Sequence, residues 1–254
     1  MKNERIKNIL YNLYIIISGD SMKKILLIIL VFSLTVTACV GLNKGIEQKI
    51  AYTSASKALP ITVVIDAGHG GKDAGAIGYD NNCEKDINLA IALMLYDYLM
   101  FSGYNAVLIR SGDYEFYKNG EQRTRSDLYN RMDFINSVEN SVLISIHQNH
   151  FENEVEWGSQ VWYSANTSES KEMADCIQSS IVEFLQPDNK RSNKQSDDSY
   201  YLLYKAKVPS VMVECGFISN REENIKLQDA SYQNNMAYSI MVGFNGVNFN
   251  GEQV

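Results

Sequence analysis

Hydrophobic residues recur along the chain with two alternating spacings. Short apolar runs, most of them rich in β-branched residues, predict buried strands at residues 61–66, 105–109, 141–146, 160–163 and 210–213. Apolar residues at helical spacing predict helices over residues 84–101, 125–137, 168–185, 221–228 and 230–244. This alternation predicts an α/β fold: a single domain with a central, mostly parallel twisted sheet flanked by helices on both faces.

An uncharged apolar segment lies before the predicted domain. Residues 25–36 read ILLIILVFSLTV, follow Lys23 and Lys24, and precede a stretch of small residues. This layout is typical of a secretory signal. We therefore expect residues 1–38 to be an export signal, with the true start at Met22. Because the uncharged run approaches about 18 residues, an uncleaved membrane anchor is the alternative.

The end of this segment is compatible with two kinds of processing. Residues 36–39 (VTAC) resemble a bacterial lipobox, in which Cys39 would become a lipidated first residue. The same small residues also suit an ordinary signal-peptidase site. Residues 39–59 are small and polar without a clear period, which predicts a linker. The folded domain is expected over residues 60–250.

The composition is that of a globular protein, and its charge is acidic. The 23 basic and 30 acidic residues give a net charge of −7. This balance argues against nucleic acid as a partner, because nucleic-acid binding depends on neutralising phosphates. Without residues 1–38, which carry five basic and two acidic residues, the charge becomes −10. The remaining cysteines, Cys83, Cys176 and Cys215, are odd in number and predict buried free thiols, with a single disulfide as the alternative.

Three predicted strands run into residues that can bind a metal or transfer a proton. His69 follows the first strand within a glycine-rich loop, His147 directly follows the third, and Glu214 directly follows the last. Because the carboxyl ends of parallel strands meet at one edge of a sheet, we expect these residues to converge. Two imidazoles and one carboxylate are a typical ligand set for catalytic Zn²⁺, which keeps a fourth position for water. The pattern therefore predicts a zinc hydrolase.

Spacing alone leaves the identity of the carboxylate ligand open. Asp66, Asp73, Glu84 and Glu214 are all candidates. Glu84 begins a predicted helix, where a loop returning from His69 brings it near the strand end. An acidic residue in a first helical turn also complements the helix dipole, and this second interpretation stands equally. Glu214 has no capping role, which favours it as the general base.

Two other chemistries lack their motifs. The glycines around His69 form neither a G-x-G-x-x-G register that opens a helix nor a G-x-x-x-x-G-K-[ST] loop, so a phosphate cradle is not indicated. No G-x-S-x-G elbow is present, so a serine-hydrolase triad is not indicated either.

Four segments resemble the signature blocks of zinc-dependent N-acetylmuramoyl-L-alanine amidases. These segments are residues 64–75 (VIDAGHGGKDAG), 84–86 (EKD), 145–149 (SIHQN) and 213–220 (VECGFISN). They occur in the family's order, and the resemblance covers roughly residues 60 to 246. It implies that His69, Glu84 and His147 hold Zn²⁺ and that Glu214 is the catalytic residue. It also implies that residues 60–250 form an amidase catalytic domain.

Within the family, residues 201–209 (YLLYKAKVP) are similar to the CwlD-type spore-cortex, germination-specific amidases. The resemblance implies cleavage of the amide between N-acetylmuramic acid and L-alanine in peptidoglycan, leading to muramic δ-lactam during sporulation. The expected location is outside the cytoplasmic membrane, in the cell wall or the forespore intermembrane space. Expected partners are peptidoglycan and an activating or tethering protein, with membrane attachment only through the signal segment or a lipidated Cys39.

Two alternative functions have distinct signatures. A zinc peptidase would cleave within the stem peptide, whereas a catalytically silent wall-binding module would not need both histidines and both glutamates.

Among other residues, we expect His150 to be exposed and Arg131 to form a structural ion pair. Tyr114 and Phe116 are candidates to line a glycan groove.

Overall fold

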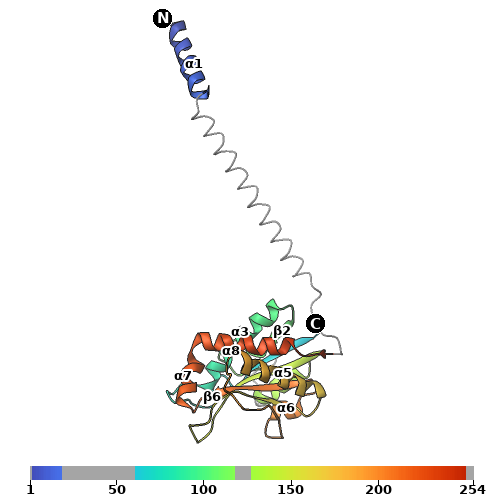
Figure 1. Ribbon diagram of the computed structural model, residues 1–254. Helices are drawn as coiled ribbons and strands as arrows, with labels where there is room; N and C mark the ends of the chain where they lie inside the picture. Colours follow the sequence, from blue (N-terminus) through green and yellow to red (C-terminus); the bar gives the residue numbers. More distant parts are fainter. Residues whose placement is uncertain (1, 19–60, 118–126, 250–254) are drawn as a thin grey trace. The chain divides into compact units, whose positions relative to one another are not determined.

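The computed structural model describes residues 2–18, 61–117 and 127–249 (Figure 1). The chain divides into two units, Met1–Lys57 and Ala58–Val254. The first contains helix α1 (Lys2–Ser18). Among the helices described, none combines the length and apolar character needed to cross a membrane. The predicted apolar run, Cys39 and the linker lie outside the described residues.

The second unit contains a six-stranded sheet within its described residues, in the order β2-β1-β3-β6-β4-β5. Neighbouring strands are parallel except β4, which runs antiparallel to β6. The predicted α/β fold with a mostly parallel sheet is therefore confirmed. The strands are β1 (Thr62–Ala67), β2 (Asn105–Leu108), β3 (Ser141–Asn149), β4 (Gln160–Tyr163), β5 (Lys194–Gln195) and β6 (Ser210–Phe217).

Helices cover the two faces of the sheet unequally. Side chains alternate between faces along a strand, so Val63 and Ile65 join the larger core cluster while Val64 joins a smaller one. The larger cluster packs under α3, α5 and α8, and the smaller one under α4 and α6; Figure 1 shows α8 and α6 on opposite sides of the sheet. The helices of this unit are α3 (Glu84–Phe101), α4 (Asp127–Ile135), α5 (Ser168–Phe184), α6 (Tyr201–Lys205), α7 (Arg221–Gln228) and α8 (Ala230–Asn245).

Two strands continue further than the sequence predicts. β3 reaches Asn149 and β6 reaches Phe217, because the two strands remain paired beyond the apolar runs, with a register shift between His147 and Asn149. His147 and Glu214 therefore lie inside strands, and the prediction that they follow the strand ends is wrong in this detail.

Two short elements were not predicted from the hydrophobic pattern. β5 has two exposed residues, Lys194 and Gln195, inside a stretch that the sequence indicates as a polar loop. α6 has only five residues and buries Leu202 and Leu203. Elements this short offer too few residues for a periodicity to be recognised. β5 pairs with β4, and α6 packs against α4 and β6.

Candidate metal site

His69 lies in a tight loop directly after β1. Its backbone has a φ of 62°, in the left-handed region that non-glycine residues rarely adopt. The carbonyl of His69 accepts a hydrogen bond of 2.6 Å from Nη2 of Arg131, and Gly70 pairs with Asp73 across the loop. Nδ1 of His69 lies 2.8 Å from Oδ2 of Asp73. This contact fixes the ring so that Nε2 faces Glu84, 3.3 Å from Oε2.

Glu84 is the first residue of α3, and its side chain turns inward. It is 3% exposed. Oε2 accepts the backbone N–H of Ala76 at 2.9 Å, and Oε1 accepts that of Gln148 at 3.0 Å. Burial alone would raise the pKa of Glu84, but hydrogen bonds from His147 and His69 hold that pKa well below its usual range. The carboxylate thus faces the histidines as well as occupying a first helical turn.

His147, on β3, completes a group of three possible ligands. Its Nδ1 lies 2.9 Å from Oε1 of Glu84, and its ring centroid lies 5.0 Å from that of His69. The ring lies against Gly68, where an added Cβ would come within 2.2 Å of ring atoms Cε1 and Nε2. One ligand atom from each of His69, Glu84 and His147 lies within 4.8 Å of the others.

The electrostatics of this group favour a cation. Burial alone would lower the pKa of His69, but hydrogen bonds and charges from Glu84 and Asp73 raise that pKa to about 9. The pKa of His147 is also raised, because Glu84 and Glu214 outweigh the effect of burial. The carboxylates around the two imidazoles make the local electrostatic potential negative. This potential favours protonated imidazoles, and it equally favours a divalent metal ion. Two imidazoles, one carboxylate and the carboxylate behind His69 match the donor set and supporting contacts of zinc sites.

Glu214 lies next to His147 across the β3–β6 pairing. Directly paired residues share a face of the sheet, so its carboxylate is on the metal side. Burial raises the pKa of Glu214 to about 7, although the charge of His147 opposes the increase. Its Oε2 is buried and has no hydrogen-bond partner among the described residues. A buried, unpaired carboxyl group with a pKa near neutrality suits proton transfer.

Two arginines hold the loop that carries His69. Arg131, on α4, pairs with buried Asp66 through Nη1 at 2.6 Å and with Asp127 through Nε at 2.6 Å. The predicted ion pair is therefore present. Arg110 is 1% exposed and donates from Nε to the carbonyl of Ala67 at 2.7 Å and from Nη2 to that of Gly68 at 2.9 Å. Sequence reasoning missed Arg110, although a charged residue directly after an apolar strand was a visible signal.

Sequence reasoning also missed Asn88, which holds the Glu84 carboxylate in place. Asn88 lies one helical turn after Glu84 and donates from Nδ2 to Oε1 of Glu84 at 3.2 Å and to the carbonyl of Gly68 at 3.1 Å. Nε2 of Gln148 donates to Oδ1 of Asn88 at 3.0 Å. This network connects α3, β3 and the loop after β1, which supply the possible metal ligands.

The remaining candidates lie outside this cluster. His150 is exposed, as expected. Phe116 packs on Phe134 of α4, with ring centroids 5.3 Å apart, so it supports the core. Tyr114 is 44% exposed, and its carbonyl lies beside Gly70 at the rim of the His69 loop. Cys83, Cys176 and Cys215 are free thiols, as predicted, but only Cys215 is buried; Cys83 and Cys176 are partly exposed.

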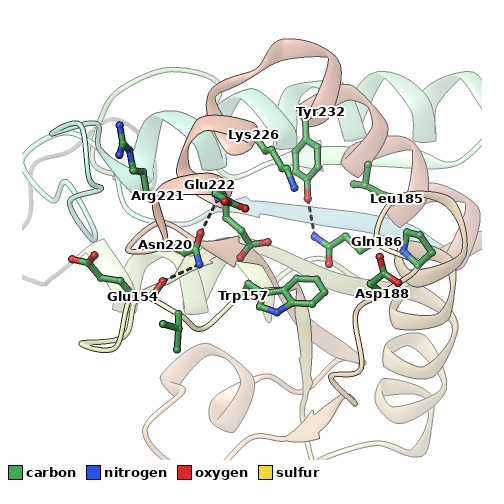
Figure 2. A pocket seen from close by; sticks show the side chains of 13 residues that line it. Glu154, Trp157, Leu185, Gln186, Asp188, Asn220, Arg221, Glu222, Lys226 and Tyr232 are labelled. Carbon is green, nitrogen blue, oxygen red and sulfur yellow. Dashed lines mark hydrogen bonds between the residues drawn. The ribbon is translucent and has the colours of Figure 1, made fainter.

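A cavity of about 710 Å³ lies elsewhere, between α7, the end of α5 and residues 154–157. Figure 2 shows Trp157 below it and Lys226 and Tyr232 above it. None of the four predicted site residues lines this cavity. The candidate metal site is therefore separate from this cavity.

Comparison with known proteins agrees with this geometry. The sequence profile of the N-acetylmuramoyl-L-alanine amidase family matches residues 63–245. The germination-specific N-acetylmuramoyl-L-alanine amidase of Bacillus subtilis (strain 168) is 31% identical over 185 residues, which cover 71% of this chain and 77% of that protein.

Two solved structures extend the comparison. The CwlD amidase of Clostridioides difficile, solved in complex with the GerS lipoprotein, has a TM-score of 0.68 and 38% identity, covering 73% of this chain and 97% of that chain. The amidase AmiC2 of Nostoc punctiforme has a TM-score of 0.65 and 31% identity, covering 74% and 97%. The chain therefore belongs to the N-acetylmuramoyl-L-alanine amidase family, and its activity is hydrolysis of the amide that joins N-acetylmuramic acid to L-alanine in peptidoglycan.

Proposed function

We propose that the protein is a zinc-dependent amidase in which His69, Glu84 and His147 hold the metal and Glu214 transfers the proton. The observation that carries this proposal is the convergence of three ligand atoms within 4.8 Å beside a buried carboxyl group that has an unpaired oxygen. When bound, zinc supplies a Lewis acid that polarises the amide carbonyl and activates water near neutral pH.

The chain's own residues have separate tasks in this mechanism. Asp73 accepts a hydrogen bond from Nδ1–H of His69 and so favours the tautomer that offers Nε2 to the metal. The Glu214 carboxylate takes a proton from the attacking water and delivers it to the leaving nitrogen of L-alanine. Its pKa of about 7 before metal binding places both protonation states within reach at neutral pH.

Fragment analysis of peptidoglycan tests this assignment. The full chain, supplied with Zn²⁺ and peptidoglycan, should release intact stem peptides that begin with a free L-alanine amine. Mass spectrometry distinguishes these products from those of a zinc peptidase, which would cut inside the stem. Products cut only inside the stem would contradict the amidase mechanism, and metal analysis of the active protein by mass spectrometry would identify the bound ion.

We further propose that the protein acts in spore-cortex maturation, where its product leads to muramic δ-lactam. The similarity to a germination-specific amidase and to CwlD supports this role. Deleting the gene in its host should remove muramic δ-lactam from the cortex and block germination while leaving vegetative walls unchanged. A cortex with normal muramic δ-lactam would contradict the role.

Export and a protein partner belong to the same proposal. We place the enzyme outside the cytoplasmic membrane because its substrate is there. Residues 1–38 would be the export signal, and the mature protein would begin either at an ordinary cleavage site or at a lipidated Cys39. The similar CwlD amidase was solved with the GerS lipoprotein, which supports an activating or tethering partner for this chain. Mass spectrometry of the mature N-terminus would determine the processing, and co-purification from sporulating cells would test for a partner.

A further inference from the structure

The face of the sheet that carries the metal site continues past Glu214 to the β4–β5 edge. Gln160 pairs with Glu214, and two residues later Trp162 pairs with Met212. Lys194 of β5 then pairs with Trp162. Because directly paired residues and residues two apart in a strand share a face, these side chains form one row leading away from Glu214.

An aromatic pair lies in this row. Tyr200, the residue before α6, stacks on Trp162 with ring centroids 4.7 Å apart and ring planes 28° from parallel. Nε1 of Trp162 is buried without a hydrogen-bond partner among the described residues, so stacking holds this ring in place. Both rings are half-buried and therefore leave part of their surface open.

A lysine lies over the Trp162 ring of this pair. Nζ of Lys194 is 5.5 Å from the centroid of the Trp162 ring. Lys194 is exposed and forms no ion pair with the described residues, although acidic residues outnumber basic ones in the chain by 30 to 23. The nearby Asp197 carboxylate instead accepts hydrogen bonds from Ser199. An ammonium group held by an aromatic face, without a protein carboxylate, is suited to an external anion.

We propose that Lys194, Trp162 and Tyr200 form a subsite for a carboxylate of the peptidoglycan stem peptide; this inference rests on the proposed function of Glu214. The stem peptide carries free carboxylates, whereas the N-acetylated sugars of the glycan are mostly uncharged. A stem carboxylate is therefore the more suitable anion. Trp162 lies two residues along β4 from Gln160, a span of about 7 Å. An extended peptide covers this span in about two residues. The carboxylate therefore belongs to a residue close to the scissile amide.

The test compares two sets of soluble muramyl peptides that differ only in their carboxylates. In one set the stem carboxylates are free, and in the other they are converted to methylamides. The full chain loaded with Zn²⁺ should have a kcat/KM about fivefold to tenfold higher for the free acids, the range of one charge-assisted contact at a partly open site. Lys194→Met should bring this ratio to about 1, and Lys194→Arg should restore most of it. Raising the salt concentration should lower the wild-type ratio.

Lys190→Met is the matched control, because Lys190 is exposed in the same segment, and among the described residues the cation over the Trp162 ring is Lys194. This variant should keep the wild-type ratio. Equal hydrolysis of both substrates by the wild type, or an unchanged ratio in Lys194→Met, would overturn the subsite while leaving the amidase mechanism intact. Hydrolysis of neither substrate would refute the proposed function and the subsite together.

Discussion

Gly68→Ala should weaken zinc binding at the proposed site although residue 68 is not one of the proposed ligands. The added Cβ would lie 2.2 Å from Cε1 and Nε2 of His147 and 2.7 Å from Nδ1. Ordinary contacts between heavy atoms are roughly 3.5–4.0 Å, so the ring must move by more than about 1 Å. Zinc–ligand distances tolerate only about 0.2 Å. We therefore expect zinc affinity to fall at least about 10- to 100-fold, the loss typical of disturbed ligand support.

Competition with a chromogenic chelator measures the zinc affinity, and circular dichroism with urea unfolding measures the fold. Overpacking should lower the free energy of unfolding by about 1–3 kcal/mol, which leaves a folded protein to assay. Gly112→Ala is the matched control, since its Cβ would meet only the Tyr114 ring, at 3.1 Å. A folded Gly68→Ala protein that binds zinc as tightly as the wild type would refute the assignment of His147 as a ligand.

Three further substitutions separate the roles of the site residues. Glu214→Gln should keep zinc but lower kcat about 10²- to 10⁴-fold, and an undiminished rate would exclude Glu214 as the proton carrier. Asp73→Asn should weaken zinc binding about 10- to 100-fold, measured by chelator competition; unchanged affinity would remove Asp73 from its supporting role. Arg131→Met should lower the free energy of unfolding by about 3–5 kcal/mol in urea, because buried Asp66 loses its ion-pair partner and keeps only the hydrogen bond from Ser145. Burial alone would raise the pKa of Asp66, but the charge of Arg131 lowers that pKa. The ion pair should therefore stabilise the wild type above about pH 4 and cease to do so as the pH falls further, whereas the stability of the variant should not show this loss.

The convergence of the site could be predicted because it follows from topology. His69, His147 and Glu214 are separated widely in the chain, but the carboxyl ends of β1, β3 and β6 are neighbours in a parallel sheet. The carboxylate ligand could not be chosen in this way, since Glu84 suits both a helix start and a metal site. Only the direction of its side chain, toward His147 and Gln148, distinguishes the two interpretations.

The supporting residues could not be predicted because their partners are backbone atoms. Arg110 and Asn88 act on the carbonyls of residues 67 and 68, and these contacts depend on where a loop lies in space. The row of Trp162 and Lys194 was missed for a similar reason. β5 has two exposed polar residues, so no hydrophobic pattern indicates that it joins the sheet.

The alternation of side chains along the strands nevertheless indicates which face of the sheet carries the site. One face of the sheet is apolar as far as Ile146 of β3, whereas the other changes from apolar to polar earlier, toward the carboxyl ends of the strands. The apolar residues of α4 and α6 pack where that face is still apolar, whereas at its polar end Arg131 of α4 pairs with Asp66. A change of polarity confined to every second residue thus predicts both a site and the face that carries it. The residues that show this change are Val64 then Asp66 in β1, Leu143 then Ser145 and His147 in β3, and Met212 then Glu214 in β6.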